Sequence, residues 1–233
     1  MSFSPDSSPV TRTAAEPPAP AAPPGDRVVP HAGHAKPGSP DWLLMCQKFL
    51  KKGTSIATVA PSSRFLARRM LKGIEWDKVE CVVELGAGTG PVTKEILKRI
   101  QPHTKLIIVE IDPDFCVRLR ARFPQADIVE GDASQLDELL ADRGITKVDE
   151  IISGLPLPSF PDGLRDAILA SCAKCLGETG MFRQLTIMPY VFMRLYKRYF
   201  SDVKFALVPL NVPPAGVYVC KGYRVKKAAA AAV

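Results

Sequence analysis

The chain has 233 residues, 46% of them hydrophobic, and a formal net charge of +7 at pH 7. No stretch approaches the ~18 consecutive apolar residues of a membrane-spanning helix, so we expect a chain that does not cross a bilayer. Six cysteines without the paired spacings of a disulfide framework favour a reducing cytoplasm.

Residues 1–40 differ in composition from the rest of the chain. They hold ten of the 22 prolines, mixed with Ala, Ser and Gly, and show no apolar periodicity. Such a segment cannot bury enough apolar surface to offset the entropy of ordering it, so we predict a disordered arm. It lacks the ~7–15-residue apolar centre of a signal peptide. The closing residues 226–233, "KKAAAAAV", are predicted to be a frayed tail.

Residues 41–73 are predicted to form two basic amphipathic helices. The first, "DWLLMCQKFLKKG", has Trp42 and Phe49 on one face and lysines on the other, and the second, "SRFLARRMLKG", ends at Gly73. Residues 41–72 contain the single acid Asp41 and seven basic residues, a net charge of +6: Lys48, Lys51, Lys52, Arg64, Arg68, Arg69 and Lys72. A basic patch of this kind points to nucleic acid or an anionic membrane. The first helix is either a membrane anchor or a lid.

Residues 74–225 alternate strand-like and helix-like runs. The expected strands are 81–85, 105–111, 126–132, 148–154, 181–187, 203–210 and 216–225. The expected helices are 91–100, 113–123, 134–144, 163–176 and 190–200. Continuous apolar strands separated by helices indicate an α/β fold with a doubly wound, mostly parallel sheet. The last two strands, joined by "NVPPA", are predicted to form an antiparallel hairpin.

A glycine-rich loop, "ELGAGTG" at 84–90, follows the first of these strands. Its glycines read G-x-G-x-G rather than the G-x-G-x-x-G of dinucleotide-binding proteins. Glu84 stands two residues before the first glycine, where a carboxylate suits a positively charged cofactor better than a pyrophosphate. Glu110 and Asp132 end the next two expected strands, where they could accept hydrogen bonds from ribose hydroxyls and from an adenine amine. Ser153 ends the fourth expected strand. Ligands of open parallel sheets bind at these carboxyl ends.

The stretches "VVELGAGTGPVT", "VEID" and "VEGDA" resemble the first three motifs of class I S-adenosylmethionine-dependent methyltransferases, a resemblance that covers about 79–225. It implies a seven-stranded sheet with an antiparallel last strand, S-adenosylmethionine as cofactor, S-adenosylhomocysteine as product, and no metal. By resemblance the loop lines the methionine part, Glu110 the ribose, and Asp132 with Ala133 the adenine. The expected cofactor-binding residues are Glu84, Gly86, Ala87, Gly88, Gly90, Glu110, Ile111, Asp132, Ala133 and Ser153.

The fourth-strand segment "SGLPLPSFP" (153–161) bears on the methyl acceptor. Methyltransferases of exocyclic base amines carry Asn or Asp there, followed by an aromatic residue that stacks on the base. This chain has Ser153 and Leu157 at those positions, so a flipped base would lose its stacking platform. An RNA methyltransferase similar to the rRNA adenine N6-dimethyltransferases remains the alternative, with the basic patch on RNA.

The stretches "IATVAPSSRFLARRM", "SGLPLPSFP" and "LNVPPAGVYV" resemble the soluble, Rhodobacter-type phospholipid N-methyltransferases and the related ornithine lipid enzymes. The resemblance implies N-methylation of a lipid headgroup amine by a cytoplasmic enzyme bound peripherally to the inner face of the cytoplasmic membrane. Its partners would be an anionic membrane surface and the amine-bearing lipid, without nucleic acid. The chain departs from the family in its Pro/Ala-rich arm and at Gly216, where we expect a larger residue. The choice between phosphatidylethanolamine and ornithine lipid, and the oligomeric state, stay open.

Aromatic side chains near the end of the chain could hold a methylated ammonium through their ring faces. The candidates are Tyr190, Tyr196 and Tyr218, with Phe192 a weaker one, and no general base is identified. The lipid phosphate or carboxylate needs cations or hydroxyls, for which the candidates are Ser62, Ser63, Arg64 and Arg194. Leu155 is expected to contact the substrate. Cys172 and Cys175 form a C-x-x-C in a helix-like segment, which we interpret as two inward-facing thiols rather than a metal site.

Overall fold

The computed structural model describes residues 61–187, 192–209 and 214–224, all within a single compact unit that spans Ser39–Val233. The expected helix at 41–52, the arm at 1–40 and the tail at 226–233 lie outside the described residues, as does Tyr190. In the part that is described, no helix is long and apolar enough to cross a membrane.

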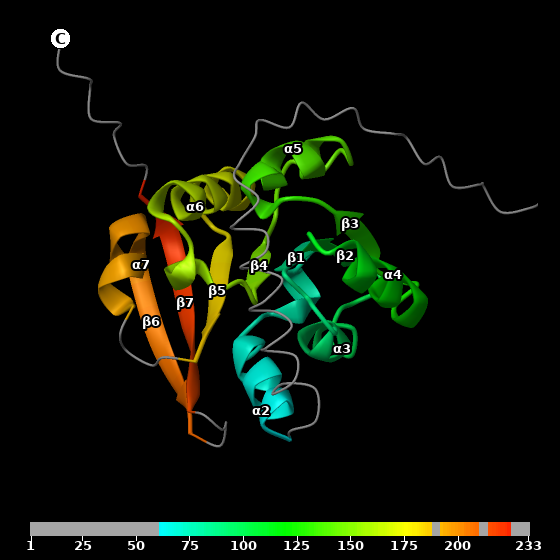
Figure 1. The fold of residues 1–233 in the computed structure, drawn as a ribbon, viewed down its shortest axis with the longest axis horizontal. Coiled ribbons are helices and arrows are strands. Elements are labelled where there is room, and N and C mark those ends of the chain that lie inside the picture. The colour runs from blue at the N-terminus through cyan, green and yellow to red at the C-terminus, as the bar shows by residue number, and fades with distance from the viewer. Residues whose placement is uncertain (1–60, 188–191, 210–213, 225–233) are drawn as a thin grey trace, which may run out of the picture. The chain divides into compact units, whose positions relative to one another are not determined.

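The described elements alternate along the chain as expected (Figure 1). The strands are β1 (Cys81–Leu85), β2 (Lys105–Glu110), β3 (Asp127–Glu130), β4 (Glu150–Ser153), β5 (Met181–Thr186), β6 (Phe200–Val208) and β7 (Ala215–Tyr223). The helices are α2 (Pro61–Met70), α3 (Pro91–Ile96), α4 (Pro113–Arg122), α5 (Leu136–Ala141), α6 (Asp162–Leu176) and α7 (Met193–Tyr199). Short 3₁₀ turns are η1 (Trp76–Lys78), η2 (Ala133–Gln135) and η3 (Leu157–Ser159).

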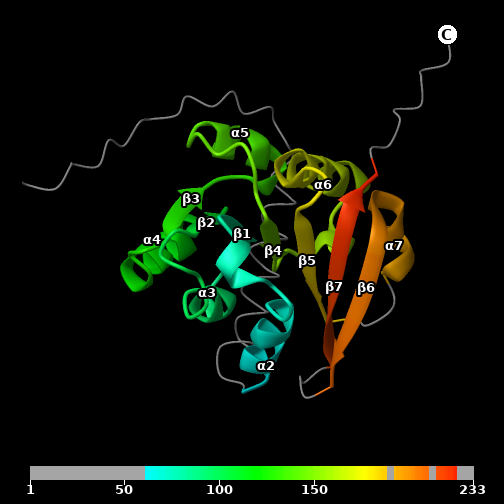
Figure 2. The ribbon, with the colours of Figure 1, turned by 180° about the vertical axis from the view of Figure 1, so that it is seen from behind.

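The strands form one seven-stranded sheet in the order β3-β2-β1-β4-β5-β7-β6. β1 pairs in parallel with β2 and β4, β2 with β3, and β4 with β5. β7 is antiparallel to both of its neighbours, β5 and β6. The doubly wound, mostly parallel sheet with an antiparallel last strand is thereby confirmed. Figure 2 shows the same order of strands from behind.

Helices cover both faces of the sheet. On one face, Leu66 of α2, Ile96 of α3 and Leu119 of α4 share a core cluster with strand residues such as Ile108 and Val217. On the other face, residues of α5, α6 and α7 pack with Leu85, Ile151, Phe182 and Tyr218, among others. Because β1 to β5 run parallel, their carboxyl ends meet at one edge of the sheet, which we call the carboxyl edge.

A buried ion pair fixes the end of α2 to the sheet. The guanidinium of Arg183, on β5, donates to both carboxylate oxygens of Glu150 on β4, at 2.7 and 3.2 Å. Its Nη1 also donates to the backbone carbonyls of Met70 and Lys72, at 3.1 and 2.9 Å. The pair therefore joins two central strands to the segment in which α2 ends.

Two details differ from the sequence-based expectations. β6 begins at Phe200 rather than at 203, directly after α7, because its first residue pairs with Tyr223 of β7. The resemblance predicts a larger residue at position 216, and the structure explains why glycine stands there. A Cβ would lie 2.3 Å from Cζ of Phe205, so the ring occupies the space that a larger residue needs. Cys172 and Cys175 are buried free thiols, as expected for the inner side of α6.

Candidate active site

The loop after β1 turns through glycines that no other residue could replace without cost. Gly86 and Gly90 have φ angles of 67° and 78°, in the left-handed region that favours glycine. A Cβ at Gly86 would lie 2.6 Å from Cδ2 of Leu155, and one at Gly90 would lie 2.4 Å from Cε2 of Phe123. Gly88 lies between them and has open space where its Cβ would be. The backbone of the loop therefore packs closely against its neighbours, and α3 begins directly after it.

Glu84 lies at the end of β1 with its side chain buried. Its Oε2 accepts a hydrogen bond from Oγ1 of Thr93, on α3, at 2.7 Å. Burial raises the pKa of the carboxyl to about 7, although the Thr93 bond lowers it and nearby Glu110 raises it further. A group with this pKa changes its charge near neutral pH, and a cation beside it would favour the ionised form.

Glu110, at the end of β2, holds the backbone of two segments. Its Oε2 accepts from the N–H of Gly88 at 2.9 Å, and its Oε1 accepts from the N–H groups of Ile111 and Asp112 at 2.9 and 3.1 Å. Burial raises the pKa of this carboxyl, and the three backbone bonds oppose that rise. A carboxylate offers about four acceptor positions. The expected ribose contact therefore shares its oxygens with the glycine loop.

Asp132 follows β3 and caps the short turn η2, because its Oδ1 accepts from the N–H of Ser134 at 2.8 Å. Its side chain borders a pocket at the carboxyl edge. The pocket is lined by Gly86, Val109, Glu110, Ile111, Gly131, Asp132, Ala133, Leu155, Pro156, Phe160 and Ile168. Five of the expected cofactor-binding residues thus meet in one place: Gly86, Glu110, Ile111, Asp132 and Ala133.

The chemistry of the lining fits S-adenosylmethionine. Among the described residues that line the pocket, only Glu110 and Asp132 have charged side chains, and the remaining lining is apolar or backbone. Carboxylates suit hydroxyl and amine donors, and apolar walls suit a purine ring, whereas a pyrophosphate would need donors or cations. Ala87, Gly88, Gly90 and Glu84 belong to the adjoining loop and strand rather than to this lining.

The segment after β4 forms one wall of the pocket. Leu155 lines the pocket and lies against Gly86. Ser153 is fully buried, and its Oγ accepts from the N–H of Leu155 at 3.3 Å. Its expected contact with the cofactor stays a prediction.

Gln184, on β5, was not anticipated from the sequence. Its Nε2 donates to the carbonyls of Leu155 and Leu185, at 2.7 and 2.9 Å, so it ties the wall of the pocket to β5. Its Oε1 is buried and has no hydrogen-bond partner among the described residues. A glutamine inside the strand "MFRQLTI" is the only signal that the sequence offered.

The candidate aromatic residues meet on the α7 side of the sheet. The rings of Tyr196 and Tyr218 lie 4.7 Å apart between centroids, and Phe205 lies 4.9 Å from Tyr218. The hydroxyl of Tyr218 accepts from the N–H of Phe192 at 3.2 Å. Both tyrosines are fully buried, so in the described residues their ring faces contact each other and their neighbours rather than an open pocket.

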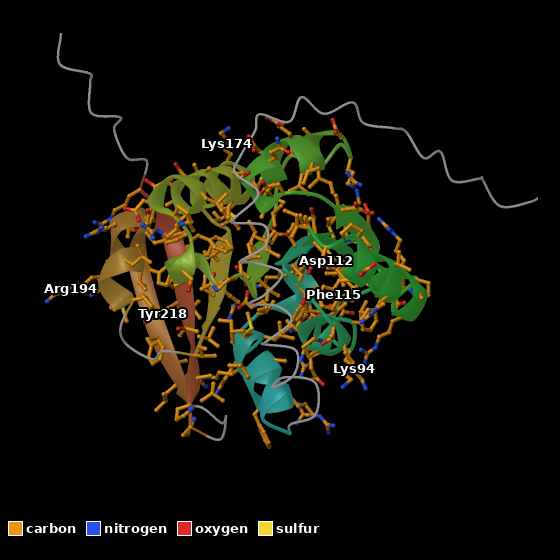
Figure 3. The ribbon with its side chains drawn as sticks, viewed as in Figure 1. Lys94, Asp112, Phe115, Lys174, Arg194 and Tyr218 are labelled. Atoms are coloured by element: carbon orange, nitrogen blue, oxygen red, sulfur yellow. The ribbon has the colours of Figure 1, made fainter. Side chains whose placement is uncertain are left out.

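The candidate residues for the acidic headgroup do not come together. Arg64 is exposed on α2, whereas Arg194 is exposed on α7 and lies on the outer side of that helix (Figure 3). The two helices pack on opposite faces of the sheet. One headgroup therefore cannot use both arginines as the structure stands. Ser62 and Ser63 belong to α2, but their side chains lie outside the described residues.

Comparison with known proteins agrees with this geometry. Residues 82–180 match a family described as "Methyltransferase domain". An ornithine lipid N-methyltransferase from Singulisphaera acidiphila is 46% identical over 187 residues, which cover 79% of this chain and 97% of the relative. Ribosomal RNA small subunit methyltransferase A from Mycoplasma mycoides is 30% identical over 95 residues, 39% of this chain and 34% of the relative.

A solved structure shares the fold. The 1,6-didemethyltoxoflavin-N1-methyltransferase of Burkholderia thailandensis superposes with a TM-score of 0.61 at 15% identity, covering 82% of this chain and 94% of the other. The glycine loop, the carboxylates of Glu110 at the end of β2 and Asp132 after β3, and near-complete coverage of a 46% identical relative agree with one another. The chain belongs to the class I S-adenosylmethionine-dependent methyltransferases.

Proposed function

We propose that this enzyme transfers methyl groups to the headgroup amine of a membrane lipid, and that ornithine lipid is its acceptor. The observation that carries the proposal is the 46% identity to an ornithine lipid N-methyltransferase over 97% of that protein. The ribosomal RNA methyltransferase matches only 39% of this chain. The longer match spans 187 residues, about twice the 95 residues of the shorter one, and therefore includes much of the chain that the rRNA enzyme does not match.

The wall after β4 supports a lipid acceptor over a nucleic acid base. Leu157, at the position where base methyltransferases carry an aromatic residue, is fully buried in η3. It has neither the ring nor the exposure that stacking on a base requires. Ser153 is buried too, and its hydroxyl oxygen already accepts from Leu155.

In the proposed reaction the cofactor supplies a methyl group on a sulfonium, and S-adenosylhomocysteine is the product. Glu84 offers a buried carboxyl close to the loop, and Glu110 holds that loop through Gly88. Leu155, whose carbonyl accepts from Gln184, is our candidate for a contact with the acceptor. The chain thus acts mainly by aligning the reactants. A displacement at a sulfonium needs no metal, because the leaving group is already activated.

The proposed acceptor places the enzyme at the inner face of the cytoplasmic membrane as a peripheral protein. The net charge of +6 in residues 41–72 supports this location, because anionic lipids attract basic segments at ~1 kcal/mol per residue. The aromatic candidates Tyr190, Tyr196 and Tyr218 stay proposals for the methylated ammonium, and Tyr196 and Tyr218 would have to become accessible first.

The test supplies the purified full chain with labelled S-adenosylmethionine and liposomes that contain either ornithine lipid or phosphatidylethanolamine. We expect label in mono-, di- and trimethylated ornithine lipid on thin-layer separation. Label in phosphatidylethanolamine alone would correct the acceptor. Absence of label in both lipids, with cofactor binding demonstrated, would refute the lipid proposal and favour RNA, to be tested with unmodified small-subunit rRNA.

A further inference from the structure

Large apolar side chains are exposed at four positions of the described residues. Phe65, Val117, Ile187 and Leu207 have exposed fractions of 46%, 64%, 51% and 40%. Exposed apolar residues scattered singly are ordinary, but residues that gather at one place mark an interaction surface. Three of these four lie on segments that adjoin one another.

Strand register places Ile187 and Leu207 at the same end of the sheet. Thr186 of β5 pairs with Gly216 of β7, and the same Gly216 pairs with Leu207 of β6. Ile187 directly follows Thr186. The two residues therefore stand two strands apart, roughly 10 Å, at the same end of the sheet. Because side chains alternate along a strand, they leave the two faces of its rim, which a bilayer would meet end-on. Since β5 is parallel to β4, this end belongs to the carboxyl edge.

Phe65 reaches the same end from α2. This helix contacts β5, β6 and β7, and its Leu66 and Met70 share a core cluster with Val208 and Ala215. Both of those strand residues adjoin the end that carries Leu207. Figures 1 and 2 agree that α2 and the ends of β6 and β7 lie at the lower border of the molecule.

The charge beside these side chains is positive. Helix α2, "PSSRFLARRM", contains three arginines and no acidic residue. Arg64 is exposed next to Phe65, and Arg68 is half exposed with a 3.5 Å ion pair to Glu95. Apolar side chains flanked by arginines suit the interface of an anionic bilayer, where the rings and aliphatic groups enter and the cations meet headgroups.

We propose that Phe65, Ile187 and Leu207 form the surface by which this enzyme enters the headgroup region of an anionic bilayer. We call it the docking surface. The inference deepens the proposed function, on which it rests, because it states which side of the molecule faces the lipid. The cofactor pocket lies at the same edge of the sheet that would meet the bilayer. A lipid amine would therefore have to rise only a short distance from the headgroup region to reach the pocket.

Val117 provides a matched control. It is the most exposed of the four side chains, but it lies on α4. That helix packs beside β3, at the opposite end of the strand order from β6. A bilayer that touches the docking surface leaves Val117 in water, so its replacement changes surface hydrophobicity without touching the contact.

The experiment measures binding of the full chain to sedimenting vesicles of phosphatidylglycerol and phosphatidylcholine in equal parts. The triple variant Phe65→Ser, Ile187→Ser, Leu207→Ser is compared with Val117→Ser. Burying the exposed half of one such side chain in the bilayer should raise the affinity for vesicles about 5-fold. The triple variant should therefore bind vesicles roughly 100-fold more weakly than the unaltered protein. Val117→Ser should bind like the unaltered protein. Unchanged melting temperatures and cofactor-induced thermal shifts confirm that both variants are folded.

A second readout separates this inference from the proposed function. Methyl transfer to ornithine lipid in detergent micelles should survive in the triple variant, whereas transfer to the same lipid in vesicles should lose apparent affinity by a similar factor. Micellar activity together with unweakened vesicle binding of the triple variant would overturn the docking surface alone. An equal loss in Val117→Ser would overturn it as well. Absence of micellar activity in the unaltered protein would instead count against the proposed function.

Discussion

At the scale of single residues, the buried carboxyl of Glu84 makes the stability of the protein depend on pH. Its pKa of about 7 lies well above the usual 4.5, mainly because burial disfavours the charged form. Between these two values the folded protein binds more protons at this site than the unfolded chain does. The free energy of unfolding therefore falls as the pH rises from 4.5 to 7.

Cofactor affinity should change in the opposite direction. With a pKa near 7, the ionised fraction of Glu84 increases about tenfold between pH 6 and pH 8. A cationic cofactor should therefore bind up to about tenfold more tightly at pH 8, as measured by calorimetry. In Glu84→Gln, cofactor affinity should no longer rise with pH through this group. In the control Glu130→Gln, which removes an exposed carboxyl at the end of β3, the pH dependence of affinity should remain. Identical pH profiles for Glu84→Gln and the unaltered protein would exclude the role.

Two glycines with the same φ angle allow the effect of backbone strain to be distinguished from the effect of a steric clash with a neighbouring side chain. Gly86 and Gly144 both have φ of 67°, but a Cβ at Gly144 would meet nothing within 4 Å, whereas one at Gly86 would meet Leu155. We expect both alanine variants to lose about 1–2 kcal/mol of stability in urea unfolding from backbone strain. Only Gly86→Ala should also weaken cofactor binding, by roughly tenfold or more, because it displaces a pocket wall. If both variants bound the cofactor with equal affinity, Leu155 would have moved aside without disturbing the pocket.

The predicted cofactor-binding residues that line the pocket share one property: each stands in the glycine turn or at or just after a strand end. Gly86, Glu110 and Asp132 could be placed because parallel topology brings strand ends together. Thr93 and Gln184 could not, because their partners depend on how a helix and a neighbouring strand pack. No local pattern encodes a hydrogen bond between positions 184 and 155.

At the scale of elements, Gln184 holds the wall after β4 in position. Gln184→Met keeps the length of the side chain but removes both donated bonds to Leu155 and Leu185. Losing the two hydrogen bonds destabilises the folded state, but the substitution also removes Oε1, a buried acceptor without a partner among the described residues. The two effects partly cancel, so the melting temperature should change little. Because Leu155 lines the cofactor pocket, cofactor affinity and turnover should both fall, each roughly tenfold, as measured by calorimetry and steady-state kinetics. Parallel losses of turnover and melting temperature would mean that Gln184 serves stability alone.

The Arg183–Glu150 pair ties α2 to the sheet and can be tested by a double-mutant cycle. Arg183→Met leaves a buried carboxylate without its partner and should cost about 3–5 kcal/mol in urea unfolding. Arg183→Met with Glu150→Met should recover most of that loss, because two apolar side chains replace two charges. Additive losses would contradict a direct coupling. The carbonyls of Met70 and Lys72 lose their donor in both variants, which limits the recovery.

Element types were predicted more reliably than element ends. Apolar periodicity indicated all seven strands, but the expected strand at 126–132 is limited to β3, 127–130, because only those residues pair with β2. The expected helix at 91–100 ends at Ile96, where the chain continues in turns. Pairing partners and neighbouring elements set these limits, and neither is visible in a single window of sequence.

At the scale of the whole molecule, we expect stability to depend on the bound cofactor and not on the arm at residues 1–40. Saturation with S-adenosylhomocysteine at 100 times its dissociation constant should add about 2.7 kcal/mol to the stability of the folded state. A chain that lacks residues 1–40 should show the same melting temperature and the same increment in a thermal shift assay, because we predict that arm to be disordered. A lower midpoint without the arm would mean that it packs on the domain.

The place of β7 in the sheet has a consequence for how the protein is made. This strand is the last element described along the chain, yet it lies between β5 and β6. During synthesis, β6 has no strand of the described sheet to pair with until residues 215–223 leave the ribosome. The free side of β5 stays open as well, and unpaired strand edges promote association between chains. Nascent chains therefore need protection until β7 has left the ribosome, and the pairing of β7 with β5 and β6 is the event that closes the sheet.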